Sequence, residues 1–412
     1  MTRKISKTLK KLQSKYGEIY TVKLGSKVFI VLSDYSLIKS ALQRPEISGR
    51  PVFHHFNVVK KHSHIGVILA VGQVWTTNRR FSIKTLRDFG LGKTMILDDV
   101  ILNEAQSLVQ DLKESLNKPI EIEWNVNVAI LNVIWKLVAD RRYEVSDKDV
   151  KKFSKNINDN FEDRDGALAV ISLFPWLIPF VPRFIMNKWM LEARIVRRRE
   201  EVFHLLLVQI KSKYSAIEVI NDHKRKLDKE NPKDLIDKYL IEKEEQKNNP
   251  DYQHWGDDDL LQNMFDFFIA GSETTSSTIR WFFLFMGRFP DIQRRVQKEI
   301  DENVPKGQCL SLQDKDKLPT LEALIFEVNR NVSLLPNALP HEVTQNTVLG
   351  GYDIPKENEY ALVNLWPKWN YSFLWESFCK TSKFLNQMDR MFLLKQTLTS
   401  TVSILPQNSK LF

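Results

Sequence analysis

The chain has 412 residues, of which 43% are hydrophobic and 11% aromatic, so it can build the core of a sizeable domain. Its 14 glycines favour a helix-rich fold, and its two cysteines exclude a disulfide framework. The net charge of +9 is spread through helical patterns without a basic block, which argues against nucleic-acid binding and leaves an anionic membrane surface or an acidic protein partner.

The first half of the chain is predicted to contain a basic helix, a β-hairpin and several longer helices. Residues 4–15 carry lysines and apolar residues at helical spacing, and residues 19–32 form two strand patterns joined by Gly25-Ser26. The longest uncharged stretch, residues 166–182, contains prolines that indicate a buried or interfacial helix and a kinked loop, not a membrane anchor. Helical patterns cover about residues 34–43, 73–87, 98–117, 124–140 and 190–215.

The longest helical pattern lies in the second half of the chain. A charge-rich surface segment, residues 221–258, leads into it and contains a short helix around Leu235 to Glu245. The long pattern begins after Gly256 with three aspartates, which suit the positive end of a helix dipole, and ends at Arg288. Only a sizeable domain can bury such a rod, and because no repeat or linker interrupts the chain we expect one domain.

A polar insert interrupts the apolar sequence of this long helix. It covers residues 270–278 (AGSETTSST) and has aromatic residues on both sides. Gly271 leaves room for a ligand against the backbone, and Glu273 beside Thr274 offers an acid and a hydroxyl that can pass protons into a closed site. A helix with one solvated face is the alternative.

Two further pairs of residues are spaced so that each shares one helix face. Trp75 and Arg79 place an indole N–H beside a guanidinium, which suits a carboxylate or phosphate; a cation stacked on the ring is the ordinary alternative. Glu327 and Arg330 can form an ion pair, which alone is a weak signal.

The order and spacing of these motifs resemble the cytochrome P-450 superfamily, and in particular the family 2-like microsomal enzymes of animals. The family's motifs follow in the family's order: W-x-x-x-R at residues 75–79, A-G-x-E-T-T in the long helix and E-x-x-R at residues 327–330. Shorter likenesses extend the resemblance over about residues 15–366. It implies a mainly α structure with small β-sheets, the cytochrome P-450 fold, incomplete at the C-terminus.

The resemblance also implies an activity and its partners. A member of this family is a heme-dependent monooxygenase that inserts one oxygen atom from O2 into a small apolar organic substrate, such as a steroid, fatty acid or xenobiotic. Electrons would come from an NADPH-dependent flavoprotein reductase bound at the basic face of the helix that carries Arg79. The family works at the endoplasmic reticulum membrane; because no anchor is evident in this sequence, a cytoplasmic location is the alternative.

Individual residues take roles from the same resemblance. Two residues would be catalytic, Glu273 and Thr274, which would relay protons to bound oxygen. Four residues would hold the heme propionates: Arg50, Trp75, Arg79 and His341. Ala270 and Gly271 would leave space beside the heme. The pair Glu327 and Arg330 would be structural and would lock the core below the heme.

The sequence departs from the family where the iron ligand should be. The family's F-x-x-G-x-R-x-C-x-G loop does not occur, and neither Cys309 nor Cys379 has a comparable context, so no metal ligand is predicted and heme binding would be weak. Residues 381–384 (TSKF) resemble the family's P-E-R-F stretch with lysine for arginine, and Glu342 reverses a charge near the expected propionates. We assign residues 1–386 to a partial P-450 domain and residues 387–412 to an unrelated or misjoined tail.

Three hypotheses remain open on these residues. The chain is a monooxygenase whose sequence is incomplete or misjoined, a catalytically inactive relic of the family, or a helical protein that holds an apolar ligand in the old cavity. Tight heme binding with a thiolate-type absorbance band would separate the first hypothesis from the other two.

Overall fold

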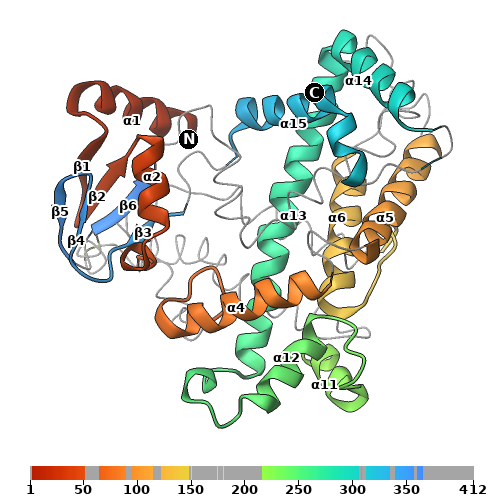
Figure 1. Cartoon of the computed structure of the whole chain (residues 1–412), viewed down its shortest axis with the longest axis horizontal. Coiled ribbons are helices and arrows are strands. Elements are labelled where there is room, and N and C mark those ends of the chain that lie inside the picture. The colour runs from red at the N-terminus through yellow and green to blue at the C-terminus, as the bar shows by residue number, and fades with distance from the viewer. Residues whose placement is uncertain are drawn as a thin grey trace.

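The structure is a computed structural model that describes residues 2–51, 65–89, 95–114, 122–147, 150, 174, 180, 216–305, 308, 312–334, 339–356 and 360–364. Helices dominate this part of the chain, and the strands gather in two small sheets on the left of Figure 1. This arrangement confirms the predicted mainly α fold with small β-sheets.

Most of the helices lie close to the ranges that the sequence predicts, whereas the helices at residues 216–226 and 290–303 were not predicted. The helices are α1 (Thr2–Tyr16), α2 (Tyr35–Leu42), α4 (Gly72–Asp88), α5 (Met95–Glu114), α6 (Ile122–Ala139), α11 (Ala216–Lys226), α12 (Leu235–Glu245), α13 (Asp257–Arg288), α14 (Pro290–Asn303) and α15 (Pro319–Val332), with short 3-10 turns at Pro45–Ile47, Pro250–Tyr252 and Leu312–Lys317. The helix predicted at residues 190–215 and the tail at residues 387–412 lie outside the described residues.

The larger sheet joins the two ends of the described chain. It has the strand order β1 (Ile19–Leu24), β2 (Lys27–Leu32), β6 (Tyr360–Asn364) and β3 (His341–Glu342), while β4 (Thr347–Leu349) and β5 (Tyr352–Ile354) form a separate hairpin. The predicted β1–β2 hairpin is confirmed, with Gly25 at a φ of 63° in its two-residue turn. β2 then pairs in parallel with β6, and β6 pairs antiparallel with β3.

One glycine brings two distant segments of this sheet together. The backbone of Gly49 exchanges hydrogen bonds with that of Glu342, with N–O distances of 3.1 and 2.9 Å. A Cβ at position 49 would lie 2.7 Å from the carbonyl oxygen of Glu342, so only glycine permits this approach. Arg50 therefore lies beside the strand that carries His341.

The basic helix α1 packs on the same sheet. Leu9 and Leu12 contact the cluster formed by Tyr20 and Val31, and the Tyr20 hydroxyl donates a 2.7 Å hydrogen bond to the Leu9 carbonyl. Part of the apolar face of this amphipathic helix is therefore covered by the protein itself.

The long helix α13 runs through the centre of the helical part and contacts α6, α14 and α15 (Figure 1). Its neighbour α6 lies between α5 and α13, and Trp135 of α6 contacts Phe268 of α13 with ring centroids 4.4 Å apart. Among the described residues α6 is the one helix long and apolar enough to cross a membrane, and 67% of it is buried inside the protein. Its apolar composition thus matches its place in the core.

Candidate active site

The polar insert of α13 is accommodated inside an unbroken helix. The hydroxyls of Ser272, Thr274 and Thr278 each donate to the carbonyl four residues earlier, with O–O distances of 2.5, 2.6 and 2.9 Å. Such bonds satisfy buried hydroxyls without an external partner. The insert therefore does not break the helix, and its chemistry depends on which face each side chain occupies.

One strip of α13 is less buried than the rest of the helix around the insert. Phe267, Ala270 and Thr274 share a face at spacings of three and four residues and are half-buried, whereas Gly271 and Thr275 are buried. The polar insert therefore presents one half-buried strip, which we call the strip on α13. Half-burial agrees both with a ligand-facing strip and with one solvated helix face, so the ligand-binding role of the insert stays a prediction.

Glu273 faces a different neighbour from Thr274. Its Oε1 atom accepts a 2.8 Å hydrogen bond from Ser277 and lies 3.7 Å from the guanidinium of Arg280, which also pairs with Glu123 of α6. The predicted acid and hydroxyl are thus adjacent in sequence, but the described contacts direct Glu273 towards α6 and leave Thr274 on the half-buried strip.

The four residues predicted to hold an anion converge into what we call the cationic site: Arg50, Trp75, Arg79 and His341. Arg50 donates 3.1 Å hydrogen bonds to the carbonyls of Ile68 and Pro340, and His341 Nδ1 lies 2.8 Å from the carbonyl of Ile47. The guanidinium of Arg79 lies 5.2 Å from the ring centre of Trp75, so the stacked arrangement is observed.

The charges of this site act on one another. Burial, and then the positive charge of Arg79, lower the pKa of Arg50 to about 10. Burial, and then the charge of Arg50, lower the pKa of His341 to about 3, so that this imidazole is neutral at physiological pH. Two half-buried guanidiniums of like charge that act on each other favour the binding of an anion beside them.

Glu342, which was expected to reverse a charge at this site, has other neighbours. Successive side chains of a strand point to opposite faces, so Glu342 and His341 diverge. Burial raises the pKa of Glu342, and the charges that oppose this shift belong to Lys27 and Lys356, outside the cationic site. In this arrangement the reversed charge at Glu342 is opposed by Lys27 and Lys356, and its effect on an anion at the cationic site stays a prediction.

The pair Glu327 and Arg330 forms as predicted, through two hydrogen bonds of 2.6 and 2.5 Å. The side chains are 52% and 31% exposed, so the pair lies near the surface of the described structure. Lys383, which stands where the resemblance places an arginine that contacts this pair, lies outside the described residues. That the pair locks a core below the heme stays a prediction.

Two carboxylates of α13 connect this helix to the cationic site, and neither role was predicted from the sequence. Asp266 Oδ2 accepts hydrogen bonds from the backbone N–H groups of Val67 and Ile68, at 2.7 and 2.9 Å. Because the carbonyl of Ile68 accepts from Arg50, α13 is linked to that arginine through a single residue. The available signal was an aspartate inside the apolar run, seven residues after Asp259 and hence on the same helix face.

Asp259 was expected to act at the helix dipole, but the structure buries it completely. Its Oδ1 atom accepts hydrogen bonds from Gly66 N and Asn78 Nδ2, at 3.0 and 2.8 Å. Its Oδ2 atom accepts from the Tyr239 hydroxyl and from Asn263 Nδ2, at 2.9 and 3.0 Å. The carboxylate therefore holds together α4, α12, α13 and the segment before α4.

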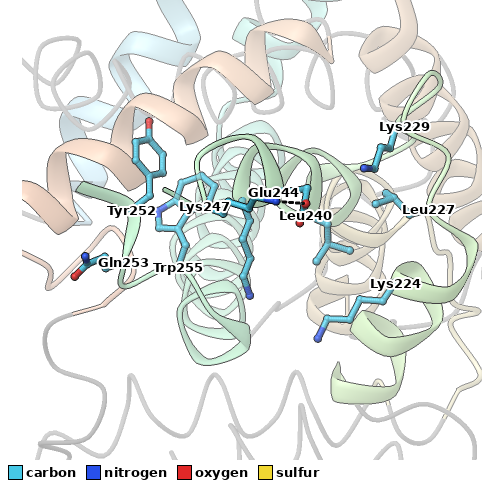
Figure 2. Close-up of a pocket in the computed structure, with 10 residues that line it drawn as sticks. Lys224, Leu227, Lys229, Leu240, Glu244, Lys247, Tyr252, Gln253 and Trp255 are labelled. Atoms are coloured by element: carbon cyan, nitrogen blue, oxygen red, sulfur yellow. Dashed lines mark hydrogen bonds and ion pairs between the residues drawn. The ribbon is translucent and has the colours of Figure 1, made fainter. Parts of the chain in front are cut away.

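An aromatic group supports the other side of α4. Trp255 stacks on Tyr239 with ring centroids 4.3 Å apart and meets Phe81 of α4 edge to face at 5.0 Å. Trp255 also lines a cavity of about 410 Å³ between α11 and α12 (Figure 2). Lysines surround this cavity, of which Lys224 pairs with Asp257 at 2.7 Å and so joins α11 to the start of α13.

Comparison with known proteins gives the family. The chain matches the family model "Cytochrome P450" over residues 1–367. It is 39% identical over 349 residues to cytochrome P450 2L1 of Panulirus argus, a match that covers 84% of this chain and 68% of that protein. It is 33% identical over 356 residues to cytochrome P450 2C28 of Mesocricetus auratus, covering 85% of this chain and 68% of that protein. The chain belongs to the cytochrome P450 family, and these relatives support a heme monooxygenase of the family 2 type.

The described residues fit part of a heme group. The cationic site offers guanidinium and indole donors for carboxylates, as heme propionates require, and the strip on α13 offers an apolar face with one hydroxyl. Cys309 and Cys379 lie outside the described residues, so the structure gives no geometry for an axial ligand. The residues of the cationic site therefore fit the propionates, and that a heme lies against α13 stays a prediction.

Proposed function

We propose that this chain acts as a heme-dependent monooxygenase that inserts one oxygen atom from O2 into a small apolar organic molecule, such as a steroid, fatty acid or xenobiotic. The observation that carries the proposal is the cationic site, in which Arg50 is held by the carbonyls of Ile68 and Pro340 and the guanidinium of Arg79 stacks on Trp75. A cofactor with two carboxylates suits such a site, which Ile68 links to Asp266 of α13.

In this proposal heme, when bound, supplies the redox chemistry that reduces dioxygen. The guanidiniums of Arg50 and Arg79 hold its propionates, and the indole N–H of Trp75 adds a donor beside them. Ala270 and Gly271 leave space along α13, because neither carries a side chain larger than a methyl group.

We assign proton handling to Thr274 and Glu273. Thr274 lies on the half-buried strip, where its hydroxyl can turn from the Ala270 carbonyl to donate to a bound ligand. Glu273, which accepts a hydrogen bond from Ser277 beside Arg280, would take up a proton from water and pass it to Thr274. These roles require the carboxylate and the hydroxyl to lie on neighbouring faces of one helix. Glu273 and Thr274 meet this requirement because they are consecutive residues of α13.

The partners follow from the surface of α4. Arg80, Lys84 and Arg87 are exposed on this helix, and Lys84 is paired with Glu242 at 3.0 Å. We propose that Arg80 and Arg87 provide the positive face for an acidic NADPH-dependent flavoprotein reductase. By family likeness the protein would work at the endoplasmic reticulum membrane.

The test is a titration of the purified chain with hemin, followed by absorbance of the reduced carbon monoxide adduct. Tight binding with a thiolate-type band supports the monooxygenase. Hemin binding without that band points to an inactive relative, and binding of apolar ligands without hemin binding points to a ligand-binding protein.

Variants of Trp75 make the titration specific for the cationic site. Trp75→Phe keeps the ring under Arg79 but removes the indole N–H, whereas Trp75→Ala removes both. If the indole donates to a propionate, Trp75→Phe should weaken hemin binding nearly as much as Trp75→Ala. An unchanged affinity in Trp75→Phe would leave only the stacking role.

A further inference from the structure

We propose that Asp259 is a positioning residue for the cationic site: its buried carboxylate fixes α4 and the segment before it against α13, and so places Arg79 and Arg50. The inference rests on the proposed role of that site in binding heme propionates. In this proposal Asp259 does not touch the cofactor, but it determines where the two arginines can hold the cofactor's carboxylates.

All four side-chain contacts of the Asp259 carboxylate are with hydrogen-bond donors. The four groups around it are a backbone N–H, two side-chain amide NH2 groups and a phenol, and a carboxylate can accept from all four. Burial, followed by the charge of Asp259, raises the pKa of Tyr239 well above its ordinary value, so the phenol keeps its proton and donates. Because both oxygens of this buried carboxylate accept hydrogen bonds from several elements, they favour one arrangement of those elements.

Asn78 carries the effect of Asp259 into α4. This side chain is buried on the inner face of the helix, directly before Arg79 and three residues after Trp75. Neighbouring residues of a helix point about 100° apart, so fixing Asn78 inward also fixes the direction of Arg79. Thr77 on the same buried face lies 3.2 Å from His254 Nε2, whereas Phe81 contributes an apolar contact that is less directional than a hydrogen bond.

Gly66 carries the effect towards Arg50. Its N–H donates to Asp259, and its carbonyl accepts a 2.9 Å hydrogen bond from the same Asn78 amide. Two residues later the carbonyl of Ile68 accepts from Arg50. Asp259 is thus connected to both arginines of the cationic site, to one through Asn78 and to the other through the 66–68 backbone.

The test compares Asp259→Asn with Glu104→Gln. The amide that Asp259→Asn introduces would present an NH2 group to neighbours that are themselves donors, so the network loses its match without a change in size. Glu104 is also a buried carboxylate, but it binds Asn132 and Arg142 and joins α5 to α6. The control therefore removes a buried acid of similar kind without touching α4.

Two readouts separate positioning from general stability. Amide hydrogen exchange is measured over residues 73–88 of α4, with residues 291–303 of α14 as the reference. Affinity is measured for hemin and for hemin dimethyl ester, which lacks the propionate charges. Asp259→Asn should speed exchange in α4 and weaken hemin binding by about tenfold while changing ester binding much less, and Glu104→Gln should change neither the α4 exchange nor the hemin-to-ester ratio.

The proposal is overturned if α4 exchanges in Asp259→Asn as in the unaltered chain, or if hemin and its ester lose affinity equally. If the unaltered chain binds neither compound, the proposed heme function fails, and the exchange of α4 still decides whether Asp259 positions this helix. If Asp259→Asn does not fold, Asn78→Leu removes the same contact from the α4 side. The same exchange and affinity measurements, with the same expected and contradicting outcomes, then apply to Asn78→Leu.

Discussion

The imidazole Nε2 of His223 lies 2.7 Å from a carboxylate oxygen of Asp234, which joins the end of α11 to the start of α12. The other ring nitrogen, Nδ1, lies 2.7 Å from the carbonyl oxygen of Val219. Both neighbours are acceptors, so both nitrogens carry protons when both bonds form, and His223 is then an imidazolium. Asp234 at the same time caps α12 by accepting from the Asp237 N–H at 3.0 Å.

This pair predicts a pH dependence of stability. Burial lowers the pKa of His223, but the hydrogen bond to Asp234, that residue's charge and further contacts outweigh burial, and the pKa is raised above 6.5. Because the pKa of His223 is higher in the folded than in the unfolded state, its contribution to the free energy of unfolding is complete below the unfolded-state pKa. This contribution is lost as pH rises through the folded-state pKa. The stability difference between the unaltered chain and His223→Gln should therefore shrink as pH rises from about 6 to about 9 in denaturant unfolding.

His254 provides a control of opposite sign. Burial lowers its pKa, so its contribution is present above the unfolded pKa and lost as pH falls. The difference between the unaltered chain and His254→Gln should grow with rising pH. A pH-independent difference for His223→Gln would contradict the imidazolium bridge.

Gly66 should be far less tolerant of substitution than Gly72. Gly66 has a φ of +83°, and a Cβ there would lie 2.5 Å from Gln262 Cγ and 2.6 Å from Asp266 Oδ2. Gly72 has a φ of +60°, but nothing lies within 4 Å of its Cβ position. We expect Gly72→Ala to lower the free energy of unfolding by about 1 kcal/mol and Gly66→Ala by about 3 kcal/mol or more, measured by denaturant unfolding. Equal losses would show that the 66–68 segment is not held against α13.

His341 should couple heme binding to proton uptake. Its pKa of about 3 makes it neutral, and because Nδ1–H donates to the Ile47 carbonyl, Nε2 has no proton to offer a propionate. A bound carboxylate favours the charged imidazole and raises its pKa. Hemin affinity should therefore fall as pH rises through the new value, with a slope that disappears in His341→Gln and with hemin dimethyl ester. The same slope in the variant would assign the proton to another group.

Thr274→Ala should uncouple electron flow from product formation in the heme-loaded protein. The substitution removes the hydroxyl on the half-buried strip, so we expect at least about tenfold less product per electron and more peroxide released. Thr274→Ser keeps the hydroxyl and should retain most of the coupling. Unchanged coupling in Thr274→Ala would remove this residue from proton transfer.

Much of the fold was accessible to local reasoning. The β1–β2 hairpin and α12 have the predicted bounds, because turn residues and hydrophobic periodicity act over a few neighbouring residues. The pairing of β2 with β6 was not predicted, since strands about 330 residues apart carry no mutual signal in one sequence.

The candidate site divides in the same way. Trp75 and Arg79 could be found because their four-residue spacing on one helix is a local property. The meeting of Arg50 with His341 was suggested only by family likeness, because it depends on the close backbone contact between Gly49 and Glu342.

By itself, then, the sequence determined the class of fold, the long helix and its polar insert, because periodicity and residue type decide these within each segment. Tertiary structure alone decided that Asp259 and Asp266 hold the backbone before α4. Whether a carboxylate sits at a solvated helix end or in a buried network depends on which donors other segments bring to it, and that is a property of packing.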